Sequence, residues 1–225
     1  LGYMTIATVF YRLIIRKHGL REKVIMAESI NTTRMNNFSS LIKKIFLGSI
    51  IIEFTGATLL SIRFISLFGW AKGIYYGVFH SISAFCNAGF DLLGSPTPFN
   101  SLVAFNNDPL VILVISALVI IGGLGFLVWD DISLKRFRFK KLNLHSKIVL
   151  TVSAVLLGLG SFLFFIFENN KLFSDMSFSS KLLNSCISAV TPRTAGFNTV
   201  DIASLSAESK LLTVILMFIG GSSGS

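Results

Sequence analysis

Long apolar stretches almost without charge constrain this chain more than any other feature. Ile45–Ile62 carries one charge, at Glu53, in 18 residues, and Pro109–Trp129 and Ile148–Phe167 carry none in 21 and 20 residues. A helix needs about 20 apolar residues to cross the roughly 30 Å hydrocarbon core of a bilayer. Only 14% of the chain is charged, against about 25% in soluble domains. Each stretch is therefore predicted to span a membrane.

The basic residues lie in two polar segments that flank these stretches. Residues 12–44 and 135–147 hold 14 of the 20 Lys and Arg, in a chain of net charge +9. Cytoplasmic loops of membrane proteins are enriched in this way, whereas a nucleic-acid reader gathers its charge into one patch. We therefore expect a multi-pass protein of the cell membrane, in contact with lipid and with its basic loops in the cytoplasm. No nucleic-acid partner is expected.

Two further apolar segments, Trp70–Phe85 and Lys181–Val190, are too short and too polar to span. An even number of crossings must separate the two cytoplasmic loops, so Trp70–Phe85 enters and leaves the membrane on the outer side. The same reasoning places Lys181–Val190 outside, before a final half span at Leu211–Gly221. Leu1–Tyr11 is predicted to be half a span, and Leu20–Ile30 an amphipathic stretch at the membrane surface.

Short strings recur along the chain and indicate an internal repeat. Ile82-Ser83-Ala84 returns as Ile187-Ser188-Ala189, and Ala88-Gly89-Phe90 returns as Ala195-Gly196-Phe197. The predicted fold is an all-α membrane protein of tandem parallel repeats, each made of a span, a re-entrant pore helix with its loop, and a span. Residues 1–40 would end a first repeat and add a basic linker. Residues 41–147 would form a second repeat with its basic loop, and 148–225 a truncated third.

Each short helix is followed by a run with a single glycine. We name Cys86–Phe90 the first glycine loop and Thr191–Phe197 the second. Glycine accepts positive φ, so carbonyls can turn toward one axis and replace the water around a monovalent cation. The preceding helices would direct their negative C-terminal ends to the same point. Either loop alone could be an ordinary turn, but two copies after short helices favour pore loops.

An intramembrane enzyme is not favoured by the sequence. Its three histidines are dispersed, no HExxH motif occurs, and no serine, histidine and aspartate share one depth. A non-conducting membrane scaffold stays open as an alternative of another class.

The loop sequences resemble those of a known family. Phe79–Phe90 is similar to the second pore loop of the Trk/Ktr/HKT superfamily of potassium transporters, and Ala189–Asn198, with Thr-Pro-Arg-Thr-Ala-Gly-Phe, to the third. The likeness is strongest to the bacterial Ktr type. It implies four span–pore–span repeats around one path, with K+ bound at filter carbonyls and no other cofactor. Two filter strands would lie in this chain: Asn87, Ala88, Gly89 and Phe90, and Thr194, Ala195, Gly196 and Phe197.

The resemblance also implies an activity and partners. The activity is potassium uptake through a channel-like pore, with a sodium-permeable or sodium-coupled transporter as the near alternative. The partners are a second copy, giving a homodimer, and a cytosolic nucleotide-binding regulatory subunit on the basic loops. The first and fourth filter strands would lie outside this chain. Cys86 departs from the asparagine usual at its position.

The run Gly220–Ser225 has three interpretations: a frayed helix end, an engineered linker, or an intramembrane gate loop below the filter. Glycine and serine disfavour a helix by up to about 1 kcal/mol per residue, so the helix would unwind here. The direct continuation from an apolar helix favours the third. The gate residues would be Gly220, Gly221, Ser222, Ser223 and Gly224.

Four further residues are predicted to support the loops. Glu53 must face protein or water, either as an acceptor for a neighbouring pore helix or as an ion-path carboxylate. Arg193 is expected to point away from the path, pair with an acid such as Asp201 and brace its loop. Thr191 opens the second loop, and Cys86 is expected to be a small packing residue, as is Cys186. His80 is expected to pack within its helix.

Overall fold

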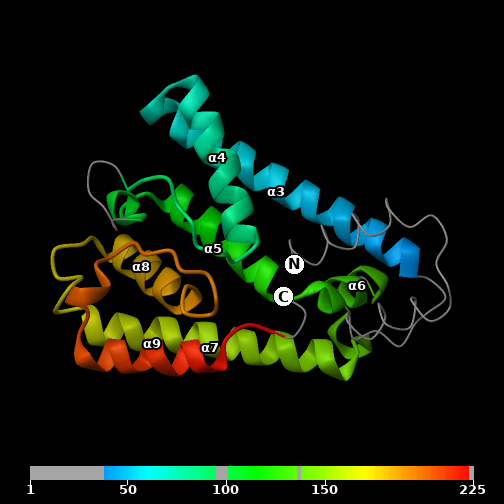
Figure 1. The fold of residues 1–225 in the computed structure, drawn as a ribbon. Coiled ribbons are helices and arrows are strands. Elements are labelled where there is room, and N and C mark those ends of the chain that lie inside the picture. The colour runs from blue at the N-terminus through cyan, green and yellow to red at the C-terminus, as the bar shows by residue number, and fades with distance from the viewer. Residues whose placement is uncertain (1–37, 95–100, 136–137, 223–225) are drawn as a thin grey trace.

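The computed structural model describes residues 38–94, 101–135 and 138–222, and in this part all regular secondary structure is helical (Figure 1). The predicted all-α membrane fold is confirmed. The predictions for Leu1–Tyr11, Leu20–Ile30, Ser223 and Gly224 lie outside the described residues. The helices are α3 (Phe38–Phe68), α4 (Trp70–Phe85), α5 (Pro109–Gly123), α6 (Phe126–Lys135), α7 (Leu144–Glu168), α8 (Phe178–Val190) and α9 (Ala207–Ile219), with 3-10 turns η2 (Val103–Phe105), η3 (Phe139–Lys141) and η4 (Ile202–Ser204).

Two helices of the described part are long and apolar enough to span a membrane by themselves. They comprise Lys44–Phe68 of α3 and Leu144–Glu168. The predicted span Pro109–Trp129 is bent, because α5 and α6 meet at 91°. Gly125 has φ +83° at the break, a conformation in which an α-helix cannot continue. Apolar composition indicated membrane depth but carried no information about straightness.

α3 and α4 form a tight antiparallel hairpin that turns at Gly69, with φ +81°. Small residues let the two helices approach closely. A Cβ on Gly77 would lie 2.2 Å from Ser61 Oγ, and one on Gly73 would lie 2.5 Å from the backbone of Ile65. The hairpin returns α4 from one end of α3 toward α5 (Figure 1). Arg63, which directly follows the predicted span Ile45–Ile62, lies inside α3 and pairs with Asp108, the N-cap of α5.

The second half of the chain repeats the order of a span, a short helix, a loop and another helix. α8 and α9 both pack against α7, and at Gly160 of α7 the nearest side chains are Ala189 and Leu216. Glu168 ends α7 and accepts hydrogen bonds from Ser206, at 2.9 Å from the backbone nitrogen and 2.7 Å from Oγ. These bonds fix the start of α9 to the end of α7.

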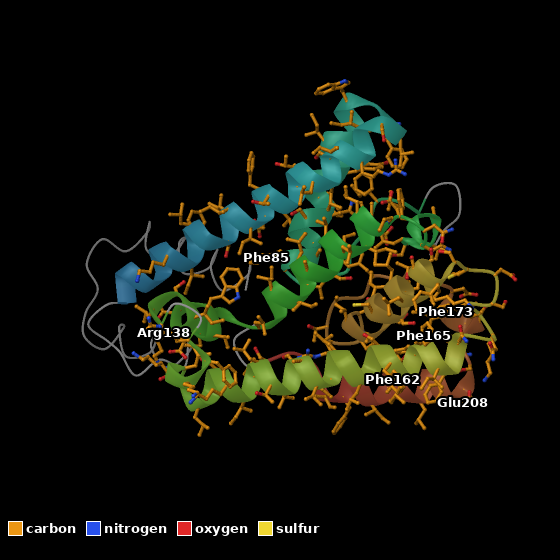
Figure 2. The ribbon with its side chains drawn as sticks, turned by 180° about the vertical axis from the view of Figure 1, so that it is seen from behind. Phe85, Arg138, Phe162, Phe165, Phe173 and Glu208 are labelled. Atoms are coloured by element: carbon orange, nitrogen blue, oxygen red, sulfur yellow. The ribbon has the colours of Figure 1, made fainter. Side chains whose placement is uncertain are left out.

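One buried apolar cluster joins the two halves around α5. Its members come from α3, α4, α5, α8 and the second glycine loop and include Leu60, Phe64, Phe85, Ile112, Ile115, Ile187 and Phe197. The outward faces are apolar as well: Phe162, labelled on α7 in Figure 2, is 60% exposed. Apolar side chains on both faces suit helices surrounded by lipid.

Candidate functional site

The two glycine loops meet backbone to backbone. A Cβ built on Gly89 would lie 2.1 Å from the carbonyl oxygen of Ala195 and 3.0 Å from Cα of Gly196. A Cβ on Gly196 would lie 3.4 Å from Cα of Gly89. The structure therefore brings the two predicted filter strands together, although they belong to different halves of the chain.

Both loops have the same backbone pattern. Asn87 and Thr194 have φ of +52° and +82°, and Gly89 and Gly196, two residues later, have +72° and +86°. The alanines between them, Ala88 and Ala195, do not. Positive φ is uncommon for asparagine and rarer for the β-branched threonine. Alternating left- and right-handed residues can turn successive peptide groups to the same side.

A hydroxyl group closes each loop at its far end. Ser83 Oγ donates to the carbonyl of Phe90, and Thr191 Oγ1 donates to the carbonyl of Phe197, both at 2.7 Å. Each donor lies at or just beyond the end of the short helix, and each acceptor directly follows the loop glycine. Thr191 is among the residues predicted to support the loops and Ser83 is not, although a hydroxyl residue near the end of both short helices was a signal for it.

Asn87 also links the two loops. Its side-chain amide lies 3.4 Å from Thr194 Oγ1. In the amide orientation in which both the oxygen and the nitrogen have hydrogen-bond partners, the nitrogen lies 3.1 Å from the carbonyl of Ala84 and 3.2 Å from that of Val119. In this orientation the amide oxygen accepts from Thr194. Phe90 and Phe197 differ, with 69% and 1% of their surface exposed.

Backbone groups contribute negative potential at the site. α4 ends at Phe85 and α8 at Val190, so both helices direct C-terminal carbonyls, with partial negative charge, toward the two loops. The described residues contain no group of three or more His, Cys, Asp or Glu that could hold a metal. Neutral carbonyl oxygens of the backbone suit a weakly held monovalent cation better than a tightly bound divalent one.

Glu53 lies against the short helix of its own half. Ser81 Oγ of α4 donates to its backbone carbonyl at 2.6 Å, and Cys86 Sγ lies 4.0 Å from its Oε1. The Glu53 side chain therefore faces protein at the start of the first glycine loop. His80 is fully buried, with Nδ1 2.7 Å from the carbonyl of Tyr76 and Nε2 accepting from the Leu92 amide at 3.4 Å.

Arg193 has different partners from those predicted. Its Nε donates to the carbonyl of Gly220 at 3.2 Å, and Nη2 donates to Ser153 Oγ at 3.0 Å. The predicted pairing with Asp201 is wrong. Asp201 instead accepts from Ser204 Oγ at 2.7 Å and from the Ala203 amide at 3.0 Å, and these bonds lower the pKa of its carboxyl. Its own turn offered nearer donors than Arg193 did.

The glycine–serine run begins where α9 stops. Gly220 has φ +65°, and α9 ends at Ile219. Ser222 Oγ then donates to the carbonyls of Gly123 and Leu124 at 3.1 and 2.7 Å. The segment Gly220–Ser222 is therefore non-helical and is bound to the break between α5 and α6.

The family follows from a comparison with known proteins. The family model TrkH, described as cation transport protein, matches residues 1–225. The chain belongs to the TrkH cation transport family. The resemblance stated from the loop sequences is thereby confirmed, and family membership agrees with the apolar helices of a membrane protein.

Curated relatives of this TrkH-family chain match it along its whole length. It is 43% identical to the potassium/sodium uptake protein NtpJ of Enterococcus hirae, over 100% of this chain and 49% of that protein. It is 40% identical to the Ktr system potassium uptake protein B of Bacillus subtilis and 36% to that of Vibrio alginolyticus, over 50% and 49% of those proteins. The chain thus spans about half the length of these relatives.

Proposed function

We propose that this chain is part of a potassium uptake protein in which K+ crosses the membrane at the contact of the two glycine loops. The observation that carries the proposal is the approach of Gly89 and Gly196 at the ends of two short helices. Two of the relatives named above are potassium uptake proteins and one is a potassium/sodium uptake protein, so the proposed cargo agrees with their names.

In the proposed mechanism, backbone carbonyls replace part of the water around K+. Positive φ at the loop residues turns peptide groups toward the path, and the hydroxyls of Ser83 and Thr191 hold the last carbonyl of each loop. The ends of α4 and α8 add negative potential without a formal charge that would hold the ion. The carbonyls belong to Asn87, Ala88, Gly89, Phe90, Thr194, Ala195, Gly196 and Phe197.

The complete path needs further parts. Residues 41–147 and 148–225 would be two repeats, and two more filter strands would come from other parts of the longer protein. We propose that the loops face the outside and that the basic segments 12–44 and 135–147 face the cytoplasm. A homodimer would bind a nucleotide-binding regulatory subunit on that basic side, where electrostatic attraction to acidic groups is strongest.

A sodium-permeable or sodium-coupled transporter is the second candidate. It is favoured by the single glycine in each loop, which leaves fewer positive-φ positions than a glycine-rich filter would have, and by the name of the Enterococcus relative. The experiment is flux through the full-length protein in vesicles under K+ or Na+ gradients. Preference for K+ supports the first candidate, comparable Na+ flux the second, and absence of flux a scaffold.

Removing the loop-closing hydroxyls is expected to weaken selectivity without abolishing transport. A hydrogen bond contributes about 0.5–1.5 kcal/mol, so Ser83→Ala or Thr191→Val is expected to reduce the K+/Na+ flux ratio by roughly two- to tenfold. Thr58→Val is the matched control, because Thr58 Oγ1 donates to the carbonyl of Phe54 in its own exposed helix turn. An unchanged flux ratio in both loop variants would contradict the role given to these hydroxyls.

A further inference from the structure

The start of the glycine–serine run connects to both glycine loops. Arg193 lies in the second loop, three residues after Val190, where α8 ends. Its side chain donates to the carbonyl of Gly220. Ser222 donates to the carbonyls of Gly123 and Leu124. Gly123 in turn lies against the first loop, since a Cβ there would be 3.2 Å from Asn87 Nδ2.

The positive charge of Arg193 lies at the C-terminal end of α9. Its partner Gly220 is the C-cap of α9, and C-terminal carbonyls of a helix attract a cation. The two hydrogen-bond partners of the guanidinium, Ser153 Oγ and Gly220 O, are both uncharged, and the side chain is half-buried. A guanidinium in such surroundings bonds strongly to a neutral carbonyl.

The segment Gly220–Ser222 is held by hydrogen bonds at its first and its last residue. Gly220, with φ +65°, takes the chain out of α9, and Gly221 lines a small cavity together with Ser153, Arg193 and Leu124. Two residues beyond Gly220, Ser222 is fixed to the α5–α6 break. The segment can leave this position only when the bonds of Arg193 and Ser222 both break.

We propose that Arg193 is a positioning residue that holds Gly220–Ser222 in the position that closes the ion path, and that Ser222 is the second restraint. The inference rests on the proposed cation transport. It adds that a residue of the second glycine loop holds the segment Gly220–Ser222, which acts as the gate. Movement of the segment then requires a change at the second glycine loop, so that gate and filter are coupled through one side chain.

The test measures basal K+ leak and the K+/Na+ flux ratio of full-length variants in vesicles without the regulatory subunit. Arg193→Gln is expected to raise the leak about tenfold at an unchanged flux ratio, which corresponds to about 1.4 kcal/mol between closed and open segment. Arg193→Lys keeps a cation at the end of α9 and is expected to restore most of the closure. Ser222→Ala is expected to raise the leak severalfold. Lys72→Gln, the loss of an exposed charge on α4, is the control.

Two results would overturn the inference. One is a leak of Arg193→Gln and Ser222→Ala that equals that of the wild type. The other is a raised leak that comes with loss of K+ preference and is not restored by lysine, because a residue that only braces the filter would behave in that way. If Arg193→Gln does not reach the membrane, Ser222→Ala decides: a leak equal to that of the wild type, or a raised leak with loss of K+ preference, overturns the inference. Absence of K+ flux in the wild type even with the regulatory subunit present would instead refute the proposed transport itself.

Discussion

Replacing Gly89 with alanine is expected to abolish selective cation transport, with K+ uptake reduced well over tenfold. The added Cβ would lie 2.1 Å from the carbonyl oxygen of Ala195, a backbone atom that no side-chain rotation can move. In addition, φ of +72° costs a residue with a Cβ about 1–2 kcal/mol. The two loops must therefore separate or the first loop must change its conformation. Uptake by cells that depend on the full-length protein is the measurement.

Two alanine variants control for the effect of the substitution itself. Gly94→Ala lies four residues beyond the first loop, no atom of the described residues lies within 4 Å of the added Cβ, and the variant is expected to transport normally. Gly196→Ala has φ of +86° but its nearest neighbour lies 3.4 Å away, so we expect a smaller loss than at Gly89. Normal uptake by Gly89→Ala, at normal amounts in the membrane, would contradict the packing of the two loops.

Gly122→Ala is expected to give the largest loss of stability. Its Cβ would lie 2.0 Å from the carbonyl oxygen of Phe85, where the end of α4 crosses α5. Overpacking in a well-packed interior costs about 1–3 kcal/mol, and here the obstacle is backbone. We expect a lower thermal unfolding midpoint of the purified protein. Because Phe85 directly precedes the first glycine loop, transport should decrease as well.

Gly158→Ala is the matched control for this stability measurement. Gly158 also lies inside a helix, α7, but no described atom lies within 4 Å of the added Cβ. Alanine is favoured over glycine in a helix interior by about 0.5–1 kcal/mol, so the midpoint should stay equal or rise. Equal midpoints for Gly122→Ala and Gly158→Ala would show that α4 and α5 do not approach as closely as described.

The elements that hydrophobicity determines were predictable from sequence. Trp70–Phe85 matches α4 to the residue, and Lys181–Val190 lies within α8, because glycine and polar neighbours mark where each apolar run stops. The recurrence of Ala-Gly-Phe predicted two similar loops, and the structure brings them together. Membrane depth, helix length and repetition are properties of the local sequence, so one sequence was enough for them.

Contacts between distant segments were not predictable in the same way. The 91° break between α5 and α6 depends on Gly125, inside a stretch that is apolar on both sides. Arg193 was expected to bind Asp201, eight residues away, but it reaches Gly220, 27 residues away. That contact exists only because α9 ends beside the second loop. The role of Asp108 as the cap of α5 had a signal, since Asp108 precedes a proline at a helix start, but its pair with Arg63 had none.

Whether a cation occupies the contact of the two glycine loops can be seen directly with Rb+ in place of K+. The measurement is anomalous diffraction from crystals of the full-length protein grown in Rb+. An anomalous peak within coordination distance of backbone carbonyls from both the Gly89 and the Gly196 loops is the predicted result. Bound Rb+ elsewhere along a continuous path, with these two loops turned away from it, would contradict the proposal.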